Sequence, residues 1–349
     1  MRLAVNVPQQ GAGEAVEEAE RLGYEIAFVP EGYRSDAASL LGYIAARTTR
    51  IHLAAGVFQM PGRTPVMTAM TTAMLDGLSG GRFRIGLGSA NAHVMEGWHG
   101  APFDRPLGRT REYVAILRAA LAGKPVVHLG EHFRIPLPGG RGEPFRLPGR
   151  LINPDIPIYL AAVGPRALEL AGEIADGWFG VFCSPDRITE ALGRIRAGAA
   201  RSGRGLAGFE VIPSVPIVVG ADPAVCADAI RNYVARFVSL GDRAHNFYYA
   251  FLEKSGHGAA AATIWQRFRD GDLDGAAAAV PFDFLDATAL LGPPDRIADR
   301  LAAYAAAGVT TIALSPFAAD PQQRLEALRV AAAASAALSP LTTKERHVH

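Results

Sequence analysis

The chain has 349 residues, and 35 basic residues balance 34 acidic residues to leave a formal net charge of +1. This balance argues against nucleic acid or an anionic membrane surface as a partner. Two cysteines, Cys183 and Cys226, provide neither a disulfide framework nor a metal-ligand spacing, and no apolar run has the length of a membrane span. We therefore expect a cytoplasmic protein without a bound metal, and the length allows one large α/β domain.

Short apolar segments alternate with segments of helical periodicity along most of the chain. Strands are predicted at 3–7, 25–29, 51–57, 83–88, 157–161, 177–181, 210–219 and 310–315. Helices are predicted at 12–22, 37–47, 65–78, 110–122, 166–175, 185–201, 223–238 and 321–338. This pattern predicts an α/β fold, a closed (β/α)8 TIM barrel whose active site lies at the C-terminal ends of the strands. A doubly wound open sheet is the alternative, but 9–13 poorly matches the glycine-rich turn that should follow its first strand.

Three segments interrupt the alternation and are predicted to be loop insertions at the C-terminal mouth. They cover about 89–108, 125–154 and 243–290. The second contains two short apolar runs around Gly130-Glu131, which predict a β-hairpin. The third is either a helical insertion over the mouth or a surface decoration. We expect one domain over 1–340 and a disordered polar tail over 341–349.

The loops after the second and third strands carry the first candidate site residues. Glu31 is either a general base or substrate clamp, or the partner of a barrel arginine. Asp36 precedes a helical segment and is predicted to be its N-cap. Arg63 either binds an anion or ties down its loop, and Phe58 of the same loop is assigned to the substrate pocket.

The loop after the fourth strand is rich in small residues. Gly86 and Gly88 would allow a flat or charged ligand to approach the backbone. Trp98 and His99 follow in the first insertion and are candidates for lining a pocket. The alternative for His99 is a structural role, which is the more common one for a lone histidine.

The segment 158–180 reads as a strand, a turn, a helix and a second strand. Its turn, Ala162-Val163-Gly164-Pro165, places free N–H groups at a helix N-terminus, where an anion can bind. Such turns are common in α/β proteins, so a structural turn is the alternative. Elsewhere, Met67, Met70 and Met74 recur at helical spacing and belong either to the core or to a subunit interface.

Longer motifs resemble a known family. The segment 78–88, LSGGRFRIGLG, is similar to the signature of the bacterial luciferase-like superfamily. Further matches at 54–65, 157–177 and 292–309 follow the same order and spacing, so the resemblance covers nearly the whole chain. Two stretches within 96–113 resemble the branch of oxidoreductases that use coenzyme F420, a deazaflavin.

This resemblance implies a TIM barrel with a deazaflavin or flavin at its mouth. It assigns the cofactor phosphate to the turn 162–165 and further cofactor contacts to Gly88, Ser89 and Ala90. It implies a non-prolyl cis peptide between Gly56 and Val57, behind the middle ring of the cofactor. It also implies a homodimer through the helices 37–47 and 65–78.

One motif departs from the family pattern. Many deazaflavin-dependent members carry Asp-His after the second strand, whereas this chain has Glu31-Gly32. The histidine proton route is therefore not transferred, and Glu31 and His99 are the catalytic candidates. Three functions follow: an F420-dependent oxidoreductase that moves a hydride between the deazaflavin C5 and a small apolar or carbonyl-bearing substrate, an FMN-dependent monooxygenase, or a barrel that binds flavin without turnover.

Overall fold

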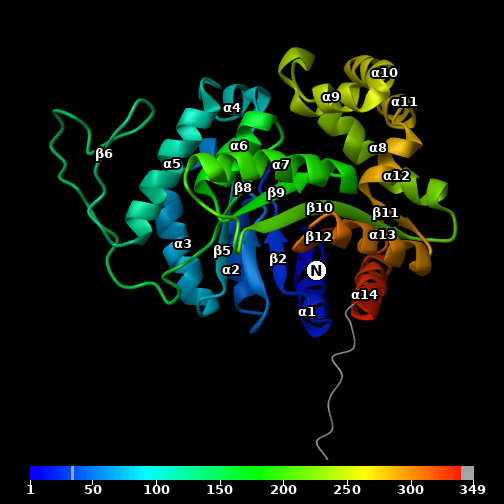
Figure 1. The fold of residues 1–349 in the computed structure, drawn as a ribbon, viewed down its shortest axis with the longest axis horizontal. Helices are drawn as coiled ribbons and strands as arrows, with labels where there is room; N and C mark the ends of the chain where they lie inside the picture. The colour runs from blue at the N-terminus through cyan, green and yellow to red at the C-terminus, as the bar shows by residue number, and fades with distance from the viewer. Residues whose placement is uncertain (33–34, 339–349) are drawn as a thin grey trace, which may run out of the picture.

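Eight parallel strands form a closed barrel in the computed structural model, which describes residues 1–32 and 35–338 (Figure 1). They are β1 (Arg2–Asn6), β2 (Ile26–Val29), β3 (His52–Ala55), β5 (Phe83–Gly88), β8 (Ile158–Ala161), β9 (Gly177–Val181), β10 (Glu210–Val219) and β12 (Thr311–Pro316). The barrel closes because β10 pairs with both β9 and β12, and β12 pairs with β1. The TIM-barrel prediction is confirmed, and the open sheet is excluded. Two short strands, β4 (Phe58–Gln59) and β11 (Leu290–Gly292), add to β5 and β10.

Helices surround the barrel and follow its strands. They are α1 (Ala12–Arg21), α2 (Ala37–Ala45), α3 (Pro65–Ser79), α5 (Pro106–Leu121), α6 (Pro165–Ile174), α7 (Pro185–Arg201), α8 (Pro223–Ser239) and α14 (Pro321–Leu338). All were predicted to within a few residues. The predictions missed α13 (Pro294–Ala306), although its buried Ile297, Leu301 and Tyr304 recur at helical spacing and could have revealed it.

The insertions carry their own secondary structure. The first contains α4 (Ala92–Gly97), the second contains β6 (His128–Leu129) and β7 (Arg134–Ile135), and the third contains α9 (Phe247–Leu252), α10 (Gly258–Arg269), α11 (Leu273–Ala278) and α12 (Phe282–Thr288). The predicted hairpin is confirmed, but four residues rather than two separate its strands. The segment around β6 projects away from the barrel, whereas α9, α10 and α11 gather above one side of it (Figure 1).

The barrel interior is filled in layers. A buried, mainly apolar cluster fills its middle and is called the middle layer here; it consists of Ala4, Ile26, Phe28, Ala54, Tyr159, Phe179, Ile212 and Ala313. At the N-terminal end, Glu210 accepts hydrogen bonds from Arg84 at 2.7 Å and Tyr159 at 2.7 Å, and it pairs with Arg2. This ionic cluster closes the bottom of the barrel, so the open end is the C-terminal mouth.

The methionine stripe lies on the outer surface of α3. The side chains of Met67, Met70 and Met74 are 49%, 52% and 64% exposed. The core alternative for this stripe is therefore wrong, because the residues that α3 buries are on its other face, including Thr68, Thr72 and Leu75. An interface with a second copy of the chain stays a prediction.

Candidate active site

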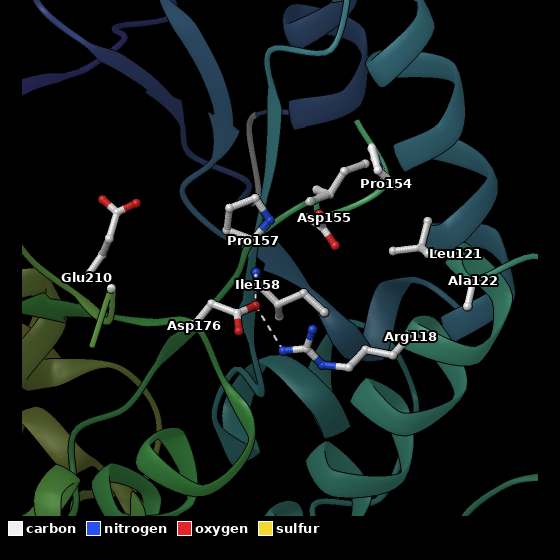
Figure 2. Close-up of a pocket in the computed structure, with 11 residues that line it drawn as sticks. Arg118, Leu121, Ala122, Pro154, Asp155, Pro157, Ile158, Asp176 and Glu210 are labelled. Carbon is white, nitrogen blue, oxygen red and sulfur yellow. Dashed lines mark hydrogen bonds and ion pairs between the residues drawn. The ribbon is translucent and has the colours of Figure 1, made fainter. Parts of the chain in front are cut away.

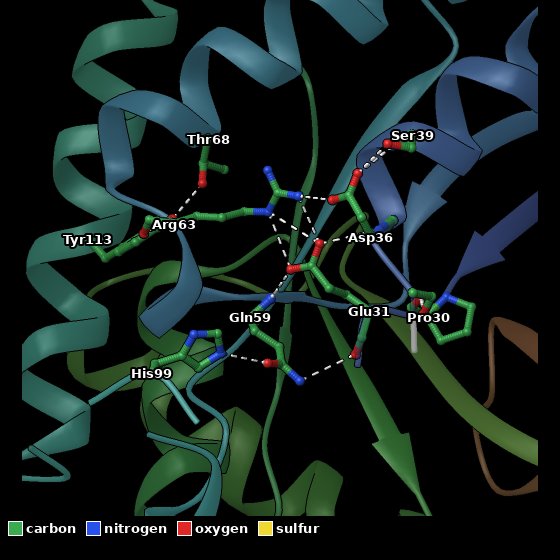
Figure 3. Close-up of polar contacts among 11 residues, drawn as sticks. Pro30, Glu31, Asp36, Ser39, Gln59, Arg63, Thr68, His99 and Tyr113 are labelled. Atoms are coloured by element: carbon green, nitrogen blue, oxygen red, sulfur yellow. Dashed lines mark hydrogen bonds and ion pairs between the residues drawn. The ribbon is translucent and has the colours of Figure 1, made fainter. Parts of the chain in front are cut away.

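Glu31 and Arg63 form an ion pair at the mouth (Figure 3). Arg63 Nη2 lies 2.9 Å from Glu31 Oε2, and the two side chains are only 13% and 11% exposed. Glu31 also accepts a hydrogen bond from the Gln59 backbone N–H at 2.9 Å. The structural alternatives for both residues are thus observed: Glu31 pairs with an arginine, and Arg63 ties the loops after β2 and β3 together.

Asp36 completes this ion-pair network. Its carboxylate accepts from the Ser39 N–H at 2.9 Å, which confirms the predicted N-cap of α2, and from Arg63 Nη2. Burial disfavours the charged carboxylate, but the Ser39 hydrogen bonds and the charge of Arg63 together hold the pKa of Asp36 below its usual range. The guanidinium of Arg63 therefore has two carboxylate partners, Glu31 and Asp36.

His99 joins the same network through Gln59 (Figure 3). His99 Nε2 lies 3.1 Å from Gln59 Oε1, and the Gln59 side-chain amide donates to the Glu31 carbonyl at 3.4 Å. The ring packs on Gly62, where a Cβ would lie 2.8 Å from His99 Cε1. The structure thus connects both catalytic candidates, and Gln59 is a connecting residue that the sequence prediction did not single out.

The two residues assigned to the substrate pocket are placed differently. Phe58 is fully buried, and Arg63 Cζ lies 4.6 Å from the centroid of its ring. The structure therefore puts the Phe58 side chain beneath the ion pair and not on the surface of the mouth, which corrects its assignment to the pocket. Trp98 ends α4 and is 63% exposed.

The backbone between β3 and β4 has the predicted bulge. The peptide bond between Gly56 and Val57 is cis, as expected. Val57 fills the space above the neighbouring strand: a Cβ on Gly88 would lie 2.7 Å from Val57 Cγ2, and a Cβ on Gly86 would lie 2.0 Å from the Ala55 carbonyl oxygen. These two glycines therefore leave room for the adjacent chain, and the approach of a ligand to their backbone stays a prediction. The cofactor contacts of Gly88, Ser89 and Ala90 stay a prediction.

The turn after β8 is open. No heavy atom lies within 4 Å of the position that a Cβ on Gly164 would occupy. Gly164 is the N-cap of α6, Pro165 follows it, and no side chain caps the helix. First-turn N–H groups are thus left for a ligand or solvent. Arg187 Nη2 donates to the Val163 carbonyl at 3.1 Å, so a cation that the sequence prediction missed lies beside this turn.

The floor of the mouth is the top layer of the barrel interior. Its half-buried side chains are Asn6, Val57, Ala161, Val181, Ser214 and Ser315. One half of the floor is apolar, and the other half, formed by β1, β10 and β12, is polar. Among the described residues, no three His, Cys, Asp or Glu side chains are placed to hold a metal ion.

A pocket of about 390 Å³ lies at the opposite, N-terminal end of the barrel (Figure 2). Its lining includes Arg118, Asp176 and Glu210. Asp176 is already engaged, because its Oδ2 accepts from Arg118 at 2.9 Å and from the Ile158 N–H at 2.9 Å. Glu210 belongs to the ionic cluster at the barrel bottom. We therefore assign this pocket to the structural end of the barrel.

Comparison with known proteins agrees with this arrangement. A sequence profile described as luciferase-like monooxygenase matches residues 5–311. This chain belongs to the luciferase-like monooxygenase family. The predicted resemblance is confirmed. Relatives in this family are named as oxidoreductases, which supports the assignment of this protein as an oxidoreductase enzyme. No helix in the described part of the chain is both long and apolar enough to cross a bilayer.

Relatives within the luciferase-like family cover nearly the whole chain. Rv3520c of Mycobacterium tuberculosis, named as a proposed coenzyme F420-dependent oxidoreductase, is 34% identical over 329 residues, which are 92% of this chain and 95% of the relative. A 5,10-methylenetetrahydromethanopterin reductase of Archaeoglobus fulgidus is 29% identical over 310 residues, 88% of this chain and 90% of the relative. The solved coenzyme F420-dependent tetrahydromethanopterin reductase of Methanopyrus kandleri superposes with a TM-score of 0.80 at 25% identity, covering 95% of this chain and 96% of that protein.

Proposed function

We propose that this enzyme is an F420-dependent oxidoreductase of a small apolar or carbonyl-bearing substrate, working in the cytoplasm. The open, uncapped turn at Gly164 is the observation that carries the proposal. A helix N-terminus with a glycine N-cap and unobstructed space above it suits a phosphate ester such as that of the deazaflavin. Relatives named as F420-dependent over nearly the full chain support the choice of cofactor.

The residues of this turn would hold the phosphate. Pro165 lacks an N–H, so the donors are Gly164, Arg166 and Val163. The helix N-terminus adds roughly half a positive charge. Arg187, which donates to the Val163 carbonyl and pairs with Glu190 at 3.0 Å, places a guanidinium beside the site. Arg63 is committed to Glu31 and Asp36, so we expect it to order the mouth and to contribute little to phosphate binding.

When bound, the deazaflavin supplies a hydride position at C5, and the protein supplies orientation and a dry site. Val57 lies half-buried on the floor of the mouth, next to Gly88. The network of Glu31, Gln59 and His99 borders the same floor and keeps its loops in place. Glu31 and His99 stay the candidates for holding a proton, since both carry titratable groups at this rim.

An FMN-dependent monooxygenase is the second candidate, favoured by the description of the family itself. Titration of the purified protein with F420 and with FMN, followed by fluorescence, separates the two. We expect F420 to bind at least tenfold more tightly. Equal or tighter FMN binding, together with oxygen consumption by the reduced complex, would reverse the ranking. Tight binding of either cofactor without turnover over a broad substrate panel would favour a non-catalytic barrel.

A further inference from the structure

Three polar side chains form a hydrogen-bonded cluster on the floor of the mouth, on the neighbouring strands β10, β12 and β1. Asn6 ends β1, Ser214 lies within β10, and Ser315 lies near the end of β12. Asn6 Nδ2 donates to Ser214 Oγ at 2.9 Å and to Ser315 Oγ at 2.8 Å, and a third acceptor, the Ala313 carbonyl oxygen, lies farther away at 3.3 Å. The cluster therefore joins three strands from distant parts of the chain at one point.

The strand alternation shows that this cluster faces the barrel interior. Ala4, Ile212 and Ala313 belong to the buried middle layer. Each cluster residue follows one of them by two positions, so it lies on the same face of its strand and nearer the C-terminal mouth. All three cluster residues are half-buried, whereas the layer below them is buried. The cluster is thus accessible from the mouth.

The hydrogen-bond inventory leaves two donors in this cluster. Each seryl oxygen already accepts a hydrogen bond from the Asn6 amide, so each hydroxyl keeps its proton to donate. Within the described part of the chain, the structure records no acceptor for these two protons. A hydroxyl that accepts a hydrogen bond becomes a stronger donor. Asn6, Ser214 and Ser315 carry no charge, so the cluster suits a neutral oxygen that gains negative charge during reaction.

We propose that Ser214 and Ser315, positioned by Asn6, bind the carbonyl oxygen of the substrate, and that the substrate class is neutral ketones and aldehydes. This inference rests on the proposed function. The carbonyl carbon receives a hydride from the reduced deazaflavin, which is thereby oxidised. The C=O π pair moves to oxygen, and the resulting alkoxide takes a proton from water. The proton that the deazaflavin loses on oxidation neutralises the hydroxide that remains. Two preorganised hydroxyl donors stabilise the developing alkoxide more than the starting carbonyl.

The test uses cyclohexanone labelled with ¹³C at the carbonyl and the protein loaded with oxidised F420. We expect infrared spectroscopy to show a lowered carbonyl stretch in the wild-type complex and loss of this shift in the double variant Ser214→Ala/Ser315→Ala. We also expect the double variant to bind the ketone at least tenfold more weakly and to keep its F420 affinity within twofold. Each single variant should lose part of the shift, which keeps the test valid if the double variant is unstable.

Two further variants complete the test. Asn6→Leu should weaken the shift with both serines present, because the hydroxyls lose their orienting donor. Ser202→Ala, the same chemical change at the far end of α7, should leave the shift and both affinities unchanged. If the serine variants have a lowered melting temperature but an unchanged carbonyl stretch, the cluster only stabilises the contact between its strands, and the inference is overturned. A tenfold loss of F420 affinity in the serine variants would also overturn it, by assigning the cluster to the cofactor.

F420 binding is measured before any ketone is added, so the two proposals fail separately. If the wild-type protein does not bind F420, the proposed function fails and this inference fails with it. If F420 binds normally and the ketone spectrum is the same in wild type and serine variants, this inference alone is overturned.

Discussion

Gly164 offers a substitution that separates cofactor binding from folding. Its φ of −82° is open to any L-residue, and a Cβ there would meet nothing within 4 Å. Gly164→Val should therefore fold normally, but its side chain would occupy the space above the helix N-terminus. We expect cofactor binding to weaken by about 1.5–3 kcal/mol, on the scale of one or two charge-assisted hydrogen bonds. Fluorescence titration measures the affinity, and circular dichroism checks the fold.

The matched control for this variant is Gly193→Val, on the exposed side of α7, where a Cβ also meets nothing within 4 Å. It should bind the cofactor as the wild type does. A folded Gly164→Val protein with unchanged affinity would place the phosphate elsewhere, and the proposed active site would lose its main support.

A substitution of Glu31 tests whether its ion pair with Arg63 does more than hold the loops of the mouth in place. Glu31→Gln removes one of the two anionic partners of Arg63, so we expect a loss of about 1–3 kcal/mol in the free energy of unfolding. We expect turnover to fall while the F420 affinity is kept. Chemical denaturation and steady-state kinetics measure both effects.

Arg63→Gln is the companion variant, because it breaks the same pair from the other side. If Glu31 only orders the loops, both variants should lose turnover to a similar extent with unchanged pH profiles. If Glu31 carries a proton, only Glu31→Gln should change the pH dependence of kcat. An unchanged turnover in Glu31→Gln would remove Glu31 from the catalytic candidates.

The structural role of a single residue was predictable from the sequence where that role depends on neighbours in the chain. Asp36 as an N-cap and Gly164 before a helix depend on neighbours a few positions away. The contact of Arg187 with Val163 and the cluster of Asn6 with Ser214 and Ser315 depend on barrel closure, which brings residues far apart in sequence together. No local pattern encodes such contacts, so the sequence prediction missed them.

Between elements, Glu18 joins α1 to α14. Its carboxylate accepts from Arg21 Nε at 2.7 Å within α1 and from Arg329 Nε at 2.7 Å on α14. The hydrogen bonds from Arg21, with those from Arg329, lower the pKa of Glu18 to about 2, below its ordinary value of 4.5. A carboxylate whose pKa is lower in the folded state stabilises the fold above its unfolded pKa and loses this contribution as the pH falls.

Glu18→Gln should therefore lower the free energy of unfolding by about 1–2 kcal/mol at pH 7. The difference from wild type should shrink as the pH falls from about 5 toward 3, and urea denaturation at several pH values measures it. Glu17→Gln, which breaks a more exposed pair with Arg47, is the control and should have a smaller effect. A difference that stays constant with pH would contradict the assignment of the stabilisation to the Glu18 charge.

The elements of the barrel were predictable because buried strands and amphipathic helices have strong local signals. The hairpin in the second insertion shows the limit of such signals. Its loop is four residues long because the Glu112 carboxylate, on α5, accepts the backbone N–H groups of Glu131, His132 and Phe133. The turn is therefore set by a contact with a distant helix, whereas the sequence prediction used only the Gly130-Glu131 pair.

At the scale of the whole molecule, α2 and α3 form an uncharged surface. The only charged residue in either helix is Asp76, which is buried and accepts from the Ile152 N–H at 2.6 Å. The exposed methionines of α3 therefore lie on a helix surface without charge, whereas the exposed Tyr43 of α2 has the guanidinium of Arg47 at 5.4 Å from its ring centroid. Such a face suits a two-fold dimer.

We expect the protein to be a dimer at micromolar concentration and Met70→Arg to be a monomer, since the substitution would place a charge from each copy in the apolar interface. Size-exclusion chromatography with light scattering measures both. Val225→Arg, at a residue on α8 that is 67% exposed, is the control and should stay dimeric. A monomeric wild-type protein would contradict the assignment of this face.

Closure of the barrel also determines when the backbone edge of β1 in a newly made chain becomes paired. β1 pairs with β12 in the register Arg2 with Thr311, so the first of the eight barrel strands finds its second neighbour only after the last of them has been made. Until then one edge of β1 presents unpaired backbone groups, which are a template for pairing with other chains. Chains whose translation stops before β12 therefore keep the edge of β1 open, however many βα units they contain. They are expected substrates for chaperones and proteases.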